Sequence, residues 1–428
     1  MLIDWIHWLS SLHPEELPLL LVGFLFFDAP RFAASKVCLW LEDAAGQVWR
    51  LLRGRVVEPH FDYCPSMCVL LAGYNEAETI GATIESLLGS YPRLEIIVID
   101  DGSEDGMAAE SFPYSRKYDN VQVLSRPRRG GKSSAMNFAL PYTQAEVIVN
   151  VDADSHLGPA ALWEVAQPFK DPTVGAVSAT ILARNPFARL VTWLQAYEYL
   201  HSIFVGRMVS ERLGILSIAS GGFAATRREA LERVGGWDVG PPEDLDLTMR
   251  VRKCGYKVAF AAYSQCFTDV PATWTGLYRQ RIRWDEAAVV RNHFRKHIDM
   301  AFFWSPNFSW ANFFVIIDAW LFSFFFAYAF FFYTVWICFD PPENLGHILV
   351  TFYGCALTLE LTQTLVALYY SSDRTRDLLV CAVLPLAPVY QLCLLAIRVL
   401  ANTRELFFRT SYRNNYVPEH IRESTWHW

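Results

Sequence analysis

The chain has 428 residues, enough for two or three domains with a sizeable core. Hydrophobic residues make up 53% of it and charged residues only 19%, a balance that favours a globular domain joined to membrane helices. The net charge of −7 argues against a nucleic-acid-binding protein, so no nucleic-acid partner is expected. An anionic substrate would need local lysines, arginines or a metal ion, because the overall charge does not attract it.

The N-terminal region contains a short apolar run at residues 17–27. This run is too short to cross a bilayer alone, so we predict one membrane helix within residues 5–41 that continues into an interfacial segment. Basic residues follow the apolar run at Lys36, Arg50, Arg53 and Arg55. The positive-inside rule then predicts that the next part of the chain lies in the cytoplasm.

The segment from about 65 to 280 alternates between short apolar runs and helical patterns. Strands are expected at 67–76, 95–103, 121–127, 145–155 and 175–182, with helices such as 77–90 and 131–143 between them. The alternation predicts a mostly parallel sheet covered by helices, and such sheets bind ligands at the carboxyl ends of their strands. The acidic residues at those ends are Glu76, Asp100, Asp101, Asp152 and Asp154.

Asp152 and Asp154 form a D-x-D pair that alone indicates either an acidic turn or a metal site. Several carboxylates at one edge of a sheet repel one another unless a divalent cation joins them. Oxygen ligands favour Mg²⁺ or Mn²⁺, which also bridge diphosphates. The nine cysteines are scattered without zinc-site spacing, so zinc is disfavoured.

Lys132 ends a glycine-rich stretch, "RRGGK". The stretch lacks the spacing of a P-loop, which disfavours ATP hydrolysis. Lys132 is therefore either a point charge that meets a phosphate or a solvated loop lysine.

Glu243 and Asp244 follow two prolines, just before a helix predicted to begin near Leu245. Carboxylates at a helix N-terminus are stabilised by the helix dipole. The pair either caps the helix or supplies a general base that takes a proton from an attacking hydroxyl.

Gln280, Arg283 and Trp284 are spaced to share one face of a helix. Arginine binds a diphosphate through two parallel hydrogen bonds, and tryptophan offers a flat surface to a sugar ring. Residues 287–298 then alternate apolar side chains with Arg291, Arg295 and Lys296, which predicts an amphipathic helix on the membrane surface or a plain basic anchor.

Three apolar segments follow, at residues 311–338, 345–370 and 378–397. Each is a candidate membrane span, although Pro385 and Pro388 predict a kink or break in the third. The basic tail favours a cytoplasmic C-terminus, whereas three full crossings would place it outside. One of the three segments is therefore expected to be re-entrant, interfacial or split.

The motifs together resemble family 2 processive glycosyltransferases, the membrane synthases of cellulose, chitin, hyaluronan and poly-β-1,6-N-acetylglucosamine. The matching residues, in chain order, are Y-N-E (74–76), D-D-G-S (100–103), G-K (131–132), D-A-D (152–154), S-G-G (220–222), E-D (243–244) and Q-R-I-R-W (280–284). The resemblance covers about residues 65–300 and the flanking membrane helices, and the sequence around 241–260 is most similar to the poly-β-1,6-N-acetylglucosamine synthases.

The resemblance implies a cytosolic GT-A domain with a Rossmann-like, mostly parallel sheet, joined to a transmembrane α-helical region with interfacial amphipathic helices. The expected parts are an N-terminal membrane helix and interfacial segment (1–45), the GT-A domain with its interfacial helix (46–300), a transmembrane helical region (301–402) and a cytosolic tail (403–428). A multi-pass protein of the inner or plasma membrane is implied.

The resemblance also implies roles for individual residues. The uridine and diphosphate of a UDP-sugar would be held by Tyr74, Glu76, Asp100 or Asp101, Lys132, Asp152, Gln280 and Arg283. Asp154, with Asp152, would ligate Mg²⁺ or Mn²⁺. The acceptor sugar would lie beside Gly221, Gly222, Phe223 and Trp284, with Asp244 as general base and Glu243 next to it.

The implied reaction is an inverting transfer from a UDP-sugar, best matched by UDP-N-acetylglucosamine, to the end of a growing polysaccharide that passes through the membrane. A β-glucan or hyaluronan synthase and an enzyme acting on a lipid acceptor stay open as alternatives, and an inactive nucleotide-binding export scaffold is a remote one. Pro242 and Ser155 depart from the motifs of some members. No cyclic-dinucleotide domain is evident, so regulation of that kind would need a small membrane or regulatory subunit.

Overall fold

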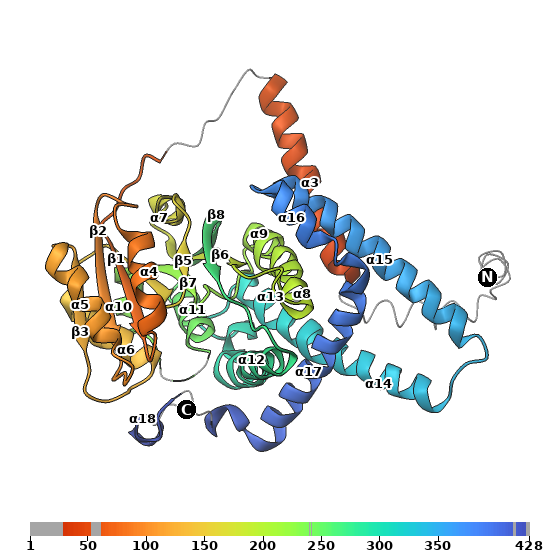
Figure 1. The fold of residues 1–428 in the computed structure, drawn as a ribbon. Helices are drawn as coiled ribbons and strands as arrows, with labels where there is room; N and C mark the ends of the chain where they lie inside the picture. The colour runs from red at the N-terminus through yellow and green to blue at the C-terminus, as the bar shows by residue number, and fades with distance from the viewer. Residues whose placement is uncertain (1–28, 53–60, 239, 241, 414–416, 425–428) are drawn as a thin grey trace.

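The computed structural model describes residues 29–52, 61–238, 240, 242–413 and 417–424. These residues form an α/β domain around one sheet and a helical region that extends away from it (Figure 1). The apolar run at 17–27 lies outside the described residues. Of the predicted N-terminal membrane segment, the structure describes only the part from residue 29 onward, within helix α3 (Ala29–Leu52).

The sheet has eight strands in the order β3-β2-β1-β4-β7-β6-β8-β5. The strands are β1 (Met67–Gly73), β2 (Leu94–Asp100), β3 (Val121–Ser125), β4 (Val147–Asp152), β5 (His156–Leu157), β6 (Val174–Ala183), β7 (Phe223–Arg227) and β8 (Lys257–Thr268). The first four pair in parallel, and so do β6 and β8, while β7 lies antiparallel between β4 and β6. The mostly parallel sheet is confirmed.

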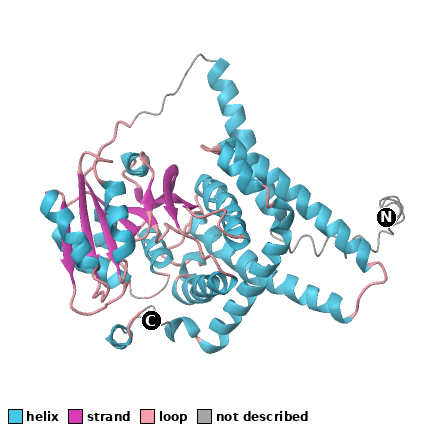
Figure 2. Ribbon diagram, viewed as in Figure 1, coloured by secondary structure: helices cyan, strands magenta, loops and turns pink. Residues whose placement is uncertain are grey.

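The first four strands are apolar runs because helices cover both faces of the sheet (Figure 2). Val69, Val98 and Val149 pack in the core on one face. Their neighbours along the strands, such as Leu70 and Ile97, pack in the core on the other face, as the alternation of side chains along a strand requires. The carboxyl ends of β1, β2 and β4 therefore meet at one edge.

The helices of the α/β domain cover this sheet and surround its carboxyl edge. They are α4 (Ala77–Leu87), α5 (Met107–Lys117), α6 (Lys132–Ala139), α7 (Ala161–Ala166), α10 (Arg228–Arg233) and α11 (Glu243–Lys253), with the short turns η1 (Leu140–Tyr142) and η2 (Gln167–Lys170). A second group is α8 (Leu190–Tyr199), which continues through η3 (Leu200–Val205) into α9 (Gly206–Arg212), and α12 (Trp274–Glu286), which continues into η4 (Ala287–Lys296) and is followed by η5 (Ile298–Ala301).

Three helices of the C-terminal third are long and apolar enough to cross a membrane: Trp310–Phe339, Leu345–Tyr370 and Leu384–Phe408. The first comprises α13 (Trp310–Asp318), η6 (Ala319–Phe325) and α14 (Phe326–Phe339); the second is α15 (Leu345–Tyr370); the third comprises η7 (Leu384–Leu386) and α17 (Ala387–Phe408). Three shorter helices complete this region: α16 (Arg374–Cys381), η8 (Thr410–Arg413) and α18 (Glu419–Ser424). The three predicted apolar segments are confirmed as helices.

The predicted kink or break at Pro385 and Pro388 is confirmed as a break, because α16 ends at Cys381 and α17 begins only at Ala387. Pro385 lies in the short turn η7, and Pro388 lies in the first turn of α17. Proline has no amide hydrogen, but the first amides of a helix have no partner within the helix, so no hydrogen bond is lost there. The fixed φ of proline also suits the start of a helix. The two prolines therefore begin the third helix, six residues after the predicted start at 378.

The basic side chains expected at the membrane surface have protein partners instead. Lys36 is 1% exposed and donates to Gln363 of α15 at 2.7 Å. Segment 287–296 is helical as expected, but Arg291 is 6% exposed and Arg295 pairs with Glu405 at 2.8 Å. The cations of η4 therefore form neither a stripe that faces lipid nor a plain basic anchor, because carboxylates and aromatic rings of the protein surround them. The sequence alone could not show these partners.

Candidate functional site

A small pocket of ≈ 10 Å³ opens beside the central strands and the start of α11. Its wall includes Lys132, Asn150, Gly221, Glu243 and Asp244. Residues from four separate parts of the chain meet here because β4 and β7 are neighbours and α6 and α11 begin at their ends.

Asp244 is held in one orientation at the pocket wall. Its Oδ2 accepts a hydrogen bond from the amide of Gly221 at 2.7 Å, and its Oδ1 accepts from the amide of Leu245 at 2.8 Å. A side chain on Gly221 would approach this carboxylate, since an ideal Cβ would lie 3.1 Å from Oδ2. Helix α11 begins at Glu243, two residues before the predicted start, so both carboxylates lie in its first turn.

Lys132 lowers the pKa of Glu243, and Glu243 raises the pKa of Lys132. Burial and then repulsion by Asp244 raise the pKa of Glu243, and the charge of Lys132 offsets only part of this. Burial disfavours the charged form of Lys132, but Asp152, Glu243 and Asp244 outweigh it and raise the pKa of the ammonium group. Lys132 is thus a cation among carboxylates and not a solvated loop lysine.

Lys132 also links the end of β4 to the glycines that precede β7. Its Nζ forms an ion pair with Asp152 and donates to the carbonyl of Gly221 at 2.8 Å. Asn150 of β4 donates to the same carbonyl at 2.8 Å. Gly222 accepts a hydrogen bond from the amide of Asp152 at 3.1 Å, so residues 221–222 lie between Asp152 and Asp244.

Asp154 and Glu76 lie close to Asp152 at the carboxyl edge of the sheet. Burial and then repulsion by Asp152 raise the pKa of Asp154. Burial also raises the pKa of Glu76, with further contributions from Asp154 and Asp152 against the hydrogen bond from Thr79. Such mutual repulsion among carboxylates is what a bound divalent cation relieves.

The fit of these carboxylates to a metal ion is partial. Among the described residues, no group of three or more histidine, cysteine or acidic side chains is arranged to hold a metal. Asp152 and Asp154 supply oxygen ligands of the right kind, although Asp152 already pairs with Lys132. Mg²⁺ and Mn²⁺ sites commonly take one or two protein carboxylates and complete their shell with water and substrate phosphates, so the residues fit a metal that arrives with its nucleotide.

The two carboxylates of the D-D-G-S motif form hydrogen bonds and an ion pair with other residues of the protein. Asp101 accepts from the amides of Gly130 (3.0 Å) and Gly131 (2.6 Å) and pairs with Arg126 at 2.7 Å. Asp100 accepts from the amide of Ser103 and the hydroxyl of Ser125, both at 2.9 Å. Both carboxylates shape the turns beside the site, and their direct contact with a uridine stays a prediction.

Two further features bring the glycine-rich loop close to the Y-N-E and D-D-G-S motifs. The guanidinium of Arg129 stacks 4.2 Å above the ring of Tyr74. Gly102 has φ +77°, and a Cβ there would lie 2.8 Å from the amide nitrogen of Arg129. Tyr74, Asp101 and Lys132 are thereby arranged along one continuous edge of the sheet.

The acceptor-side prediction is only partly supported for Phe223. Its ring is buried in the core of the sheet as the first residue of β7, so its side chain does not face a pocket. Only its backbone is near Gly222 and Asp152.

Gln280, Arg283 and Trp284 all lie on α12, as their spacing predicted. Trp284 is 37% exposed, and the guanidinium of Arg281 lies 4.6 Å from its ring centre. Gln280 has a buried amide oxygen without a hydrogen-bond partner among the described residues. None of the three side chains lines the pocket beside Asp244, so the structure places them on one helix without closing them onto the pocket.

Comparison with known proteins identifies the sheet and its motifs. Residues 68–235 match the family described as "Glycosyl transferase family 2". The chain carries a family 2 glycosyltransferase domain. Glu243, Asp244 and helix α12 follow the matched residues, so their assignment depends on the geometry described above.

The family 2 domain has curated bacterial relatives. The chain is 30% identical over 235 residues to a poly-beta-1,6-N-acetyl-D-glucosamine synthase of Staphylococcus epidermidis, covering 54% of this chain and 57% of the relative. It is 30% identical over 226 residues to a protein of the same description from Staphylococcus aureus (strain COL), covering 52% of this chain and 54% of the relative. The chain thus matches little more than half the length of these relatives.

A solved structure extends the likeness of the fold beyond the family 2 domain. A mannosyltransferase from Pyrobaculum calidifontis, solved in complex with GDP-Man and Mn2+, matches with a TM-score of 0.58 and 22% identity. The match covers 91% of this chain and 99% of that chain. The predicted GT-A fold is confirmed, as is the likeness to the synthase family.

The structure adds residues to the glycosyltransferase domain that the motifs did not indicate. Arg281 forms a buried double hydrogen bond with Glu198 of α8, and Asp246 of α11 meets three donors. Each left a signal in the sequence: Glu198 is a lone charge in an apolar stretch, and Asp246 directly extends the E-D motif. Neither signal names the distant partners, because Lys296 and His297 lie 50 and 51 positions from Asp246 and Arg281 lies 83 positions from Glu198.

Proposed function

We propose that this protein is a membrane-bound, inverting glycosyltransferase that moves a sugar from a UDP-sugar to the end of a growing β-linked polysaccharide. UDP-N-acetylglucosamine is the proposed donor, since the curated relatives are described as poly-beta-1,6-N-acetyl-D-glucosamine synthases. The observation that carries the proposal is the orientation of Asp244, whose carboxylate is fixed at the pocket wall beside Gly221 and near Lys132.

In the proposed reaction an acceptor hydroxyl attacks the anomeric carbon on the face opposite the nucleotide. The bond from this carbon to the diphosphate oxygen breaks, and UDP leaves. Asp244 accepts the proton of the hydroxyl, because its side chain is anchored by two backbone amides and does not need to reorient. No nucleophile of the protein is needed, which agrees with the chemistry of the pocket.

Several groups would stabilise the leaving diphosphate, through charge or through hydrogen bonds. Lys132 supplies a fixed ammonium at the strand end, and Gln280 and Arg283 supply donors from α12. Mg²⁺ or Mn²⁺ held by Asp154 and Asp152 would stabilise the charge on the diphosphate oxygens when bound. Tyr74 and Glu76 lie on the side proposed for the uridine, and Trp284 offers its exposed face to the acceptor sugar.

The membrane helices fit a synthase that passes its product outward. We infer a multi-pass protein of the plasma membrane with the glycosyltransferase domain in the cytoplasm, where UDP-sugars are available. Its proposed partners are the UDP-sugar, the polysaccharide end and the lipid bilayer, with a small membrane or regulatory subunit as a further one.

The test is a donor screen on membranes that contain the full chain. Membranes are given labelled UDP-N-acetylglucosamine, UDP-glucose, UDP-glucuronic acid or GDP-mannose, with Mg²⁺, Mn²⁺ or EDTA, and the products are sized. The proposal expects long polymer from UDP-N-acetylglucosamine and none with EDTA. A glucose polymer, a glucuronate-containing polymer or a glycolipid would assign the alternative enzymes, and absence of turnover with every donor would contradict the proposal.

Asp244→Asn tests the base within the same assay. The variant should lose turnover by roughly 100-fold or more while UDP binding, measured by calorimetry, stays within about twofold, since a general base acts mainly on the chemical step. Asp119→Asn, at an exposed position between α5 and β3, is the matched control and should behave as the unaltered protein. Normal synthesis by Asp244→Asn would show that the base is elsewhere.

A further inference from the structure

Asp246 lies two residues beyond Asp244 but on another face of α11. Residues two apart do not face the same way on a helix, so Asp246 does not line the pocket that Asp244 and Glu243 line. It is 3% exposed and meets three donors: Arg250 at 2.8 Å, Lys296 at 2.7 Å and His297 at 2.9 Å. The reaction proposed above gives this carboxylate no chemical step.

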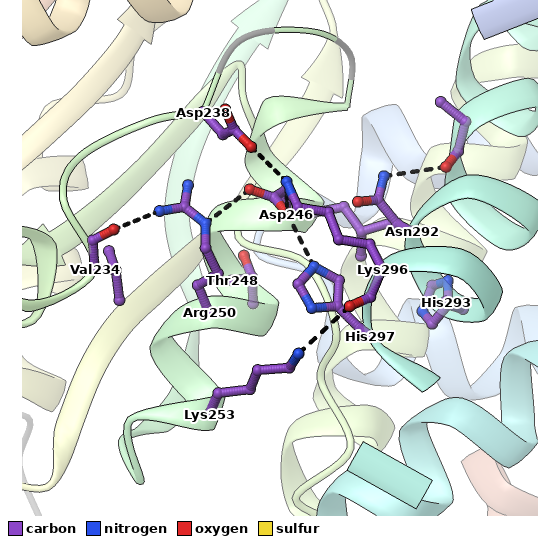
Figure 3. Close-up of polar contacts among 12 residues, drawn as sticks. Val234, Asp238, Asp246, Thr248, Arg250, Lys253, Asn292, His293, Lys296 and His297 are labelled. Atoms are coloured by element: carbon purple, nitrogen blue, oxygen red, sulfur yellow. Dashed lines mark hydrogen bonds and ion pairs between the residues drawn. The ribbon is translucent and has the colours of Figure 1, made fainter. Parts of the chain in front are cut away.

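Two of the three donors come from the helix that carries the diphosphate clamp. Lys296 is the last residue of η4 and His297 follows it, and η4 continues directly from α12. The close-up shows Lys296 and His297 pointing from this helix toward Asp246 (Figure 3). Asp246 therefore joins the helix that begins with Glu243 and Asp244 to the helix of Gln280, Arg283 and Trp284.

Asp246 and its donors Lys296 and His297 connect α11 to the end of η4, and we call this connection the joint. Their charge states favour a rigid connection. Burial opposes ionisation, but His297, Arg250 and Lys296 together hold the pKa of Asp246 well below its usual range, so it is a carboxylate at neutral pH. Burial lowers the pKa of His297, against the effect of Asp246, so a neutral imidazole donates through Nε2. Hydrogen bonds to a buried charge are stronger than those between neutral groups.

The same group also fixes the loop that leads to Asp244. Arg250 donates to the carbonyls of Val234 (2.7 Å) and Gly236 (2.9 Å). Lys296 pairs with Asp238 as well as with Asp246. The chain is thus held just before the segment 239–242, and Asp246 holds it again just after Glu243 and Asp244.

We propose that Asp246 is a positioning residue that fixes the distance between Asp244 on α11 and the clamp residues on α12. The inference rests on the proposed function, because it gives the fixed distance a purpose: the proton acceptor and the diphosphate must face the same anomeric carbon. A displacement of about 1 Å in such a site costs on the order of 100-fold in rate. UDP and the acceptor still bind when the joint is loosened, since Asp246 touches neither.

The decisive variant is Asp246→Asn, which keeps the shape and removes the charge. We expect kcat to fall roughly 10- to 100-fold, while the KM for the donor and the Kd for UDP stay within about threefold. Asp299→Asn is the matched control: Asp299 lies in the same polar layer, pairs with Lys253 at 2.7 Å and accepts from Asn307, but does not contact Asp246. A kcat for Asp246→Asn within about twofold of the control would overturn the proposal, as would equal losses in kcat and UDP affinity.

Two further variants act from the other side of the joint. Lys296→Met and His297→Leu leave Asp246 in place and remove the two donors that reach it from the end of η4. Each should lower kcat without a matching change in KM, and each should add little to Asp246→Asn in the double variant, because residues that act through one another are not additive. These variants decide the question if Asp246→Asn does not fold, and full additivity would contradict the proposal.

Hydrogen exchange of the full chain in detergent tests the joint without turnover. Asp246→Asn should raise exchange together in peptides from the start of α11 and from η4, whereas Asp299→Asn should not. An inactive unaltered protein that shows this pattern would contradict the proposed function and leave the joint established. Unchanged exchange in Asp246→Asn would overturn the joint, whatever the donor screen shows.

Discussion

Lys132 shows how one side chain can hold a crowded site together. Asp152, Glu243 and Asp244 all contribute to its raised pKa, so three carboxylates from two parts of the chain lie near one ammonium group. The sequence left open whether Lys132 was a solvated loop residue, because only the carboxylates were visible and not their distance from it. Its partners in the fold decide that question.

Replacement of Lys132 by methionine should weaken both the site and its activity. The carboxylates lose their counter-charge, so the free energy of unfolding should fall by about 1–2 kcal/mol, less than for a fully buried pair because Asp152 is 40% exposed. Turnover in the UDP-sugar assay should fall by roughly tenfold or more. Lys170→Met is the control, since Lys170 pairs with Asp62 at the surface; equal effects from the two variants would contradict this role.

His293 should make stability depend on pH. It is 5% exposed and its Nδ1 lies 2.7 Å from the carbonyl of Ala288. Burial lowers its pKa to about 4, whereas an unfolded chain has a histidine pKa of about 6.5. Between these values the unfolded chain binds a proton that the folded protein does not, so stability falls as pH falls through this window and is fully present above it.

Thermal unfolding at pH 7 and pH 5 measures this contribution. The free energy of unfolding should be lower at pH 5 by about 2 kcal/mol from His293 alone. His293→Gln should reduce the difference between the two pH values by that amount. An unchanged difference in the variant would show that His293 does not titrate as its burial requires.

At the scale of elements, a buried ion pair joins α8, α12 and α17. Glu198 of α8 accepts two hydrogen bonds from Arg281 of α12, at 2.7 and 2.9 Å, and a third from the hydroxyl of Tyr390 of α17 at 2.7 Å. Arg281 in turn stacks on Trp284. The position of the proposed acceptor platform is thereby fixed to the third apolar helix.

Glu198→Gln should cost much more stability than loss of a surface ion pair. Removing one partner of a buried pair leaves an uncompensated charge and costs about 3–5 kcal/mol. Glu232→Gln, which loses an exposed pair with Arg228, should cost less than about 0.5 kcal/mol. The two variants are compared by thermal unfolding in the same detergent, and similar midpoints would contradict a stabilising role for the Glu198 pair.

The elements differ in how far the sequence could reveal them. Strands β1 to β4 and β6 were predictable because apolar runs bounded by turns are typical of buried strands. Strand β7, "FAATR", has too little apolar contrast to be recognised, and its antiparallel place between β4 and β6 depends on distant pairing. The motif residues of the candidate site were predictable because each motif is a local pattern in the sequence. Glu198 and Asp246 acquire their roles from partners far along the chain.

The whole molecule places both ends of the helical region beside the glycosyltransferase domain. Arg404 pairs with Glu286 at 3.1 Å and Glu405 pairs with Arg295 at 2.8 Å, so the end of α17 contacts α12 and η4 (Figure 1). Tyr390 contacts Glu198 nearer the start of the same helix. A chain that leaves the domain and returns to it crosses a membrane an even number of times. We therefore expect α13–α14 and α15 to cross and α17 to lie along the domain.

Thiol labelling in intact cells tests this arrangement. Glu343→Cys lies between the two expected crossings, Glu104→Cys lies in the α/β domain and Glu419→Cys lies after α17. A membrane-impermeant reagent should label only the first in intact cells and all three after permeabilisation, each compared with the unaltered chain. Labelling of Glu419→Cys in intact cells would show that α17 crosses.

The contact of α17 with α12 has a consequence for inhibition. Arg404 of α17 pairs with Glu286 of α12, and Tyr390 of α17 reaches Arg281 of α12 through Glu198 of α8. None of these residues lines the pocket beside Asp244. A small lipophilic compound that inserted between the two helices would displace α12, the proposed clamp helix, without occupying the proposed sugar-nucleotide site. Such a compound would lower the maximal rate at any donor concentration, so cells could not overcome it by accumulating more UDP-sugar.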